Sequence, residues 1–192
     1  YIYQGEELGM TNYPFKTPAD FHDIESINAY REWCESGSLS YEIFWPCLTF
    51  ISRDNARTPV QWDDSQSAGF TTGTPWMPVN PNYKEINAKA ELQDPQSVFY
   101  YYKKLIQLRK EYPVIVYGKY QLLLPDDPDL FVYTRELEKE KLLVVCNFSG
   151  KEQSIQLPEE FVNGKCLISN LPGQYDQQQV QLKPYEAFVL YR

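Results

Sequence analysis

The chain has 192 residues, of which 43% are hydrophobic and 16% aromatic, so it can build one full domain or parts of two around a core. Its 26 acidic and 18 basic residues give a net charge of −8, which repels nucleic-acid phosphates and anionic membrane surfaces. No apolar run approaches the roughly 20 residues that span a bilayer. We therefore expect no nucleic-acid partner and no membrane partner.

The chain opens on an apolar run without a Met or a targeting segment, which is typical of a fragment. Residues Tyr1–Glu7 predict a short strand that turns at Gly5 and ends in two carboxylates. Adjacent side chains on a strand point to opposite faces, so Glu6 and Glu7 cannot act as one acid–base pair. We expect both to hydrogen-bond loop amides.

Helical spacing of apolar residues and capping residues predicts three helices in the middle of the chain. Long ordered loops rich in Pro, Asn and Asp separate them, and Asp94 is the expected cap of the last helix, which Pro113 ends. The predicted helices are Asp23–Glu35, Tyr41–Ile51 and one that follows Asp94 and ends before Pro113, with a loop over Ser52–Asn87.

From Val114 onward the pattern changes to short alternating runs separated by turn residues. Runs of this length predict an antiparallel β-sandwich of about 80 residues, with a domain boundary near Pro113. The predicted strands are Tyr120–Leu124, Leu130–Arg135, Lys141–Phe148, Ser154–Leu157, Lys165–Ser169, Gln179–Leu182 and Ala187–Tyr191.

The four cysteines have no Cys-x-x-Cys spacing, and His22 is the only histidine. This composition gives no support to a zinc site or to dithiol redox chemistry. We therefore predict no cofactor, no metal and reduced thiols, as in a cytoplasmic protein.

The segment Ser52–Trp62 carries the residue with the best claim to contact a ligand, Arg57. A guanidinium offers paired donors to a carboxylate or to neighbouring hydroxyls and stays charged at any relevant pH. The alternative is that Arg53, Asp54 and Arg57 form a local ion-pair lattice that only ties down the loop. Spacing alone leaves both interpretations open.

Segments along nearly the whole chain, in order, resemble the oligo-1,6-glucosidase type of α-glucosidase, in the α-amylase family of glycoside hydrolases. This group also holds dextran glucosidases and trehalose-6-phosphate hydrolases. The segments that carry the resemblance are Tyr3–Asn12, Asp23–Asn28, Arg53–Pro59, Ala68–Phe70, Pro75–Trp76, Val79–Tyr83, Ile86–Asn87 and Lys183–Ala187.

The resemblance implies an α+β fragment: the last strand, long loops and closing helix of a (β/α)8 barrel, followed by an antiparallel β-sandwich. Residues 1–113 would be the carboxyl-terminal end of the catalytic barrel and residues 114–192 the sandwich. Within the first part, Tyr1–Gly5 would be the last barrel strand and Gln96–Lys110 its closing helix.

The resemblance also implies a retaining, exo-acting enzyme that cleaves α-glucosidic bonds of short oligosaccharides with a pair of carboxylates. All the family's catalytic acids would lie upstream of Tyr1, so this chain has no catalytic residue. Arg57 resembles the arginine that closes the glucose pocket, and Glu25 a residue that faces the neighbouring sugar. The choice among α-1,6, α-1,4 and trehalose-6-phosphate substrates stays open.

Aromatic side chains that could stack on sugar rings accompany these residues, and we expect one or two of them to do so. The candidates are Tyr13, Phe15, Trp62, Phe70 and Trp76.

Two other functions fit the same residues: a non-catalytic carbohydrate-binding or regulatory module, and a membrane-bound relative that serves a transporter. A module would start at a domain boundary, whereas this chain starts within an apolar run. An unpaired barrel strand also exposes backbone donors and acceptors, so we expect self-association through Tyr1–Leu8.

The absence of the catalytic acids gives a first prediction. The 192-residue chain alone will release no glucose from isomaltose, because nothing in it supplies the nucleophile or the general acid. Glucose release is measured with pure chain against a heat-killed sample; release above that control would contradict the prediction.

Overall fold

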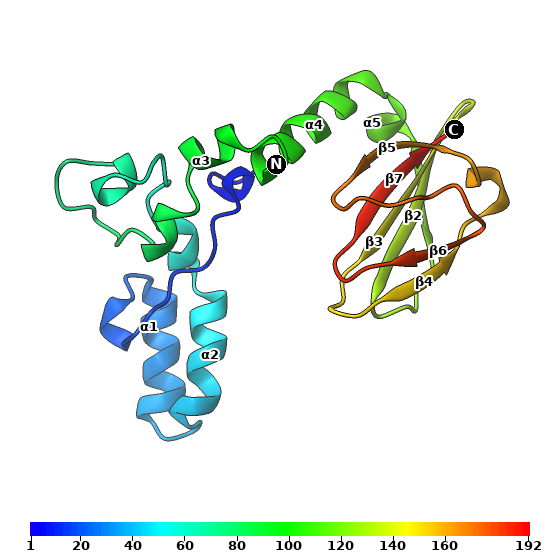
Figure 1. Cartoon of the computed structure of the whole chain (residues 1–192). Coiled ribbons are helices and arrows are strands. Elements are labelled where there is room, and N and C mark those ends of the chain that lie inside the picture. The colour runs from blue at the N-terminus through cyan, green and yellow to red at the C-terminus, as the bar shows by residue number, and fades with distance from the viewer. The chain divides into compact units, whose positions relative to one another are not determined.

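A computed structural model describes residues 1–192 and divides them into two compact units (Figure 1). The amino-terminal unit is Tyr1–Tyr100 and the carboxyl-terminal unit is Tyr101–Arg192. Helix α4, Val98–Glu111, contains the point of division.

The amino-terminal unit is built around two helices, α1 (Ile24–Tyr30) and α2 (Tyr41–Ile51), which lie side by side in Figure 1. Both confirm the predicted helices, although the last predicted turns of the first one, Arg31–Glu35, are a π-helix. Their shared core buries Phe15, Phe21 and Leu48.

The predicted strand at the start of the chain is wrong. Only the turn at Gly5 is present, at φ 91°, and a 3₁₀ helix follows over Glu6–Leu8. A strand requires a paired neighbour, and no segment pairs with this one. Instead the carboxylate of Glu6 accepts the Tyr3 amide at 3.0 Å and that of Glu7 accepts the Gly5 amide at 2.9 Å. The expected bonds from both glutamates to loop amides are therefore confirmed.

The loop over residues 52–87 is ordered by buried amide side chains rather than by long regular elements. It contains only short 3₁₀ helices, at Arg53–Arg57, Gln66–Gly69 and Pro81–Lys84. The Asn80 amide donates to the Thr11 and Asn12 carbonyls at 3.0 and 3.1 Å. These bonds fix the loop against the start of the chain, because a buried amide that lost them would be costly.

The structure adds two helices that the sequence patterns did not predict, α3 (Ala88–Gln93) and α5 (Val114–Tyr117). Helix α4 also starts later than predicted, at Val98, because Asp94 does not cap it. The Asp94 carboxylate accepts the Gln96 amide at 2.9 Å in the turn between α3 and α4. Both added helices are too short to show helical periodicity.

The carboxyl-terminal unit confirms all seven predicted strands, with shifts of one or two residues at some ends. They are β1 (Lys119–Leu123), β2 (Leu130–Leu137), β3 (Glu140–Asn147), β4 (Gln153–Gln156), β5 (Lys165–Ser169), β6 (Gln179–Leu182) and β7 (Ala187–Tyr191).

The strands form two antiparallel sheets, one in the order β1-β2-β3-β7-β5 and one of β4 and β6. Both sheets contribute to one core, as Val145 and Phe188 from the first and Ile155 and Val180 from the second show. Strand β7, the last in the chain, thus lies between β3 and β5, paired on both edges.

The other face of the five-stranded sheet is partly covered by α5 and the second half of α4. Leu108 and Val114 from these helices form a second core with Leu142, Leu167 and Ile168 of the strands.

A buried polar pair, Tyr175 and Glu186, lies beside the core between the two sheets. The Tyr175 hydroxyl donates to Glu186 Oε1 at 2.7 Å, and Glu186 Oε2 accepts the Lys183 amide at 2.7 Å. Burial raises the pKa of Tyr175, so the hydroxyl keeps its proton and stays a donor. Glu186 is only 2% exposed, which makes this donor important to the unit.

This pair gives a second prediction. Tyr175→Phe will lower the free energy of unfolding by about 1 to 3 kcal/mol, because the buried carboxylate loses a donor while the ring is kept. Tyr120→Phe, on an exposed ring, is the matched control and should leave stability unchanged. Urea unfolding of the three proteins checks this, and equal midpoints would contradict the role of the pair.

Candidate functional site

The candidate site is organised by one fully buried carboxylate, that of Asp54, in the 3₁₀ helix Arg53–Arg57. Its Oδ2 accepts the amides of His22 and Asp23 at 2.7 and 2.8 Å. Its Oδ1 accepts Arg57 Nη1 at 3.0 Å. Asp54 therefore fixes the guanidinium of Arg57 to the loop that precedes α1.

A second carboxylate, that of Asp23, joins the two arginines of this segment. Asp23 Oδ1 accepts Arg57 Nη1 at 3.3 Å and lies 2.8 Å from Arg53 Nη2. Its Oδ2 accepts the Ser26 amide at 3.1 Å and so caps α1. One buried side chain thus starts a helix and positions two cations.

The two residues predicted to face substrate, Arg57 and Glu25, are linked through this network. The exposed Glu25 carboxylate pairs with Arg53 Nη2 at 2.9 Å, and Arg53 also binds Asp23. The ion-pair lattice weighed from the sequence is present, with Asp23 added to it. Arg57 nevertheless keeps 35% of its side chain exposed, so it can still reach a ligand.

The charges of the network are stable near neutral pH. The bond to Asp54 raises the pKa of Arg57, which stays protonated. Burial raises the pKa of Asp23, but hydrogen bonds from Arg53 and Ser26 outweigh it and hold that pKa below its usual value. A lowered carboxyl pKa adds stability above about pH 4, and this stability is lost as the pH falls through the lowered value.

A cavity of about 260 Å³ opens beside Arg57. Its wall combines polar and aromatic side chains, with Phe70 and Trp76 exposed by 48% and 68%. The residues that line it are Gln4, Arg57, Thr58, Pro59, Val60, Phe70, Trp76 and Met77.

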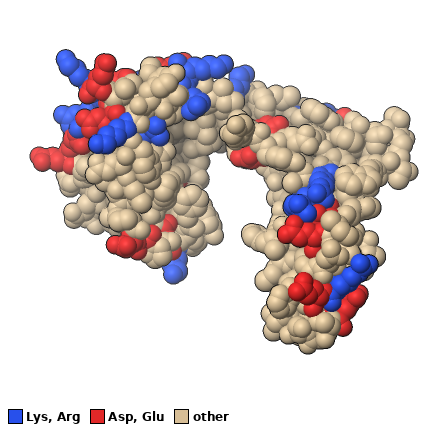
Figure 2. Space-filling view, turned by 180° about the vertical axis from the view of Figure 1, so that it is seen from behind, with Lys and Arg blue, Asp and Glu red and all other residues tan.

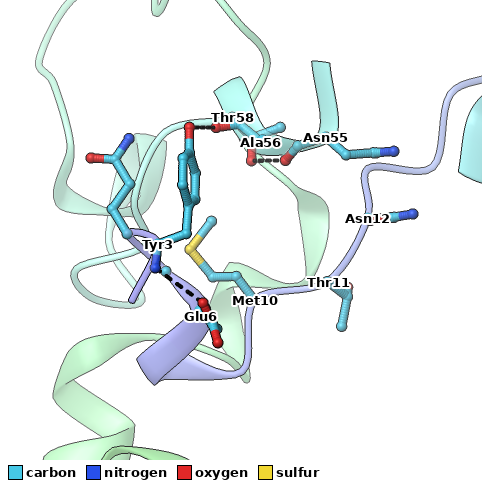
Figure 3. A pocket seen from close by; sticks show the side chains of 10 residues that line it. Tyr3, Glu6, Met10, Thr11, Asn12, Asn55, Ala56 and Thr58 are labelled. Atoms are coloured by element: carbon cyan, nitrogen blue, oxygen red, sulfur yellow. Dashed lines mark hydrogen bonds between the residues drawn. The ribbon is translucent and has the colours of Figure 1, made fainter. Parts of the chain in front are cut away.

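A second cavity of about 220 Å³ shares Gln4 and Thr58 with the first. Figure 3 shows it between the turn at the start of the chain and the Asn55–Thr58 segment, and Tyr3 crosses it to bind the Ala56 carbonyl at 2.9 Å. Side chains of Glu6, Asn12 and Asn55 give it a polar lining.

The aromatic candidates divide between the core and the cavity. Phe15 is buried and Tyr13 packs against the same core. Trp62 is 54% exposed but lies outside the wall of the cavity beside Arg57. Phe70 and Trp76 line that cavity, so these two rings are the candidates for contact with a sugar.

The sequence patterns did not predict two members of the site. Asp23 bridges Arg53 and Arg57, and Gln4 lines the cavity beside Arg57. A signal for Asp23 was available, because an aspartate directly before a helical run is an expected N-cap, and such caps are often buried. No local pattern identifies Gln4, which reaches the cavity through the turn that replaces the predicted strand.

On the face of the molecule in Figure 2, the basic side chains (blue) and the acidic side chains (red) are interspersed. No group of three or more His, Cys, Asp and Glu side chains is placed to hold a metal, and the four cysteines are free thiols. No helix of the structure combines the length and apolar character that crossing a bilayer requires.

Comparison with protein families gives two matches. The profile of the α-amylase catalytic domain matches residues 1–118, more than half of the chain. The chain belongs to the α-amylase family. A second profile, the carboxyl-terminal domain of the α-amylase SusG, matches residues 130–189.

Curated members of the α-amylase family are similar over nearly all of this chain. An oligo-1,6-glucosidase from Parageobacillus thermoglucosidasius is 52% identical over 98% of the chain, and a trehalose-6-phosphate hydrolase from Bacillus subtilis is 47% identical over 98%. The chain spans 34% of each relative, or about a third of its length.

Solved structures of α-amylase family enzymes share the fold of this chain. An isomaltulose synthase variant from Erwinia rhapontici, in complex with sucrose, has a TM-score of 0.92 and 44% identity over 99% of this chain and 34% of its own. A trehalose-6-phosphate hydrolase variant from Bacillus licheniformis has a TM-score of 0.88 and 50% identity over 100% of this chain and 35% of its own.

The geometry of the network gives a third prediction. Asp54→Ala will lower the free energy of unfolding by about 3 kcal/mol, because two backbone amides and a guanidinium lose their acceptor together. Thermal unfolding of the chain measures this.

The matched control is Asp64→Ala, which removes an exposed carboxylate paired with Lys89 at 2.8 Å. An exposed pair adds little stability, so this variant should melt with the parent. If both variants melted alike, Asp54 would not be the centre of the unit.

Proposed function

We propose that this chain is the carboxyl-terminal third of a retaining, exo-acting α-glucosidase that hydrolyses short oligosaccharides of the isomaltose type. It supplies pocket residues to that enzyme and none of the catalytic acids. One observation carries the proposal: Arg57 lies at the edge of a cavity with its guanidinium held by two carboxylates and part of it still exposed.

The chemistry of the cavity supports a sugar ligand. A fixed guanidinium donates to vicinal hydroxyls, and the neutralising carboxylates limit its attraction for phosphate. Glu25 adds an exposed acceptor on the same network, which suits the hydroxyls of a neighbouring sugar. The names of the relatives, which include oligo-1,6-glucosidases, favour this substrate class.

The proposal includes the architecture and location of the longer protein. Residues 1–113 would complete a (β/α)8 barrel with upstream strands, and residues 114–192 would be its sandwich domain. Without those strands the exposed Ile2 and Tyr3 favour self-association through the start of the chain. We place the enzyme in the cytoplasm.

A carbohydrate-binding or regulatory module remains the second candidate function. Its supporting observation is that the cavity beside Arg57 is formed by this chain alone. In that case sugar would bind to the chain without being cleaved in any form of the protein.

The role of Arg57 gives a fourth prediction. In the natural polypeptide that carries this chain, Arg57→Ala will lower kcat/KM for isomaltose about a hundredfold, because a charged hydrogen-bond donor to the substrate is lost. Glu25→Gln should lower it less, since that carboxylate is more exposed.

Arg31→Ala, which removes an exposed arginine outside the cavity, is the matched control. Loss of activity in this control, or full activity of Arg57→Ala, would refute the assignment. Isomaltose bound but never hydrolysed by the unmutated polypeptide would favour the binding module.

A further inference from the structure

The cavity beside Arg57 is lined by two unlike kinds of group. Gln4 and Arg57 supply hydrogen-bonding groups, and Phe70 and Trp76 supply aromatic surface. A hexopyranose ring has the same division, with hydroxyls around its rim and C–H groups on its faces. Those C–H groups carry a small positive charge, which suits the negative face of an aromatic ring.

Trp76 is the more accessible of the two rings. It is 68% exposed, whereas its chain neighbour Met77 is 1% exposed and belongs to the interior. The indole therefore contributes little to the core of this unit. Phe70, exposed by 48%, lines the same cavity, so two accessible aromatic rings border it. Ligand pockets are commonly lined by aromatic side chains together with a few polar groups.

Trp76 contacts a residue that is bound to the carboxylate holding Arg57. The indole meets the His22 ring edge-on, with centroids 5.6 Å apart and planes at 63°. The amide of His22 donates to Asp54 Oδ2 at 2.7 Å, and the other oxygen of Asp54 accepts Arg57. The indole and the guanidinium are thus connected through His22 and Asp54.

We infer that Trp76 stacks on the pyranose ring whose hydroxyls Arg57 binds. This inference rests on the proposed function, since it assigns a second contact in the same pocket. Trp76 makes no bond that changes in the reaction, so it contributes to substrate binding and not to the chemical step.

The experiment uses the natural polypeptide that carries this chain and measures the dissociation constant of isomaltose and, where turnover occurs, KM and kcat. Trp76→Ala should raise the dissociation constant and KM about tenfold with kcat nearly unchanged, because a stacking contact is lost from ground state and transition state alike. Trp76→Phe should restore binding to within about threefold, since a ring is retained.

Trp62→Ala is the matched control, because Trp62 is 54% exposed but lies outside the cavity. Thermal unfolding of each variant separates loss of fold from loss of binding. Weak binding by Trp76→Ala, with its melting point unchanged and the control normal, supports the inference.

The failures of the two hypotheses are distinguishable. If Arg57→Ala abolishes isomaltose binding while Trp76→Ala binds like the parent, the stacking role is wrong and the proposed function stands. If neither substitution changes binding, the cavity is not the sugar site and both are wrong. If Trp76→Phe binds as poorly as Trp76→Ala, the contact is not stacking.

Discussion

The amino-terminal unit depends on the burial of one charged group, the carboxylate of Asp54. A carboxylate without exposure is costly unless hydrogen-bond donors compensate it, and here two amides and a guanidinium donate to its two oxygens. The arrangement joins the segment before α1 to the segment after α2 through a single side chain. The contacts of Asp54 therefore set the direction in which the Arg57 side chain points.

The two units are held in their folded conformations by different kinds of interaction. The carboxyl-terminal unit buries an apolar core between two sheets, and its buried polar groups, such as the pair of Tyr175 and Glu186, are hydrogen-bonded to one another. The amino-terminal unit has a small apolar core and relies on amides such as Asn80 to fix its long loop. Directional bonds of this kind hold side chains at defined angles, which a ligand pocket requires.

Sequence reasoning succeeded wherever local periodicity determines the structure. The seven strands and the helices α1 and α2 follow from alternation and helical spacing, and all are present. It failed at Tyr1–Glu7, because an apolar run becomes a strand only when a partner pairs with it.

Within the candidate site, sequence reasoning named single residues but not the contacts between them. Arg57 and Glu25 could be named from motifs, but the bridge through Asp23 joins positions about 30 residues apart. No local pattern encodes that contact. The division of the aromatic residues into core and cavity likewise depends on packing that only the folded chain defines.

The position of β7 constrains how the carboxyl-terminal unit is made in the cell. Among the seven strands of this unit, β7 is the last along the chain, yet it lies inside the five-stranded sheet, between β3 and β5. Until it emerges from the ribosome, both neighbouring strands present open edges that invite pairing with other chains. Vectorial synthesis thus leaves this sheet incomplete until β7 has been made, and chaperone protection of the nascent chain matters most before that point.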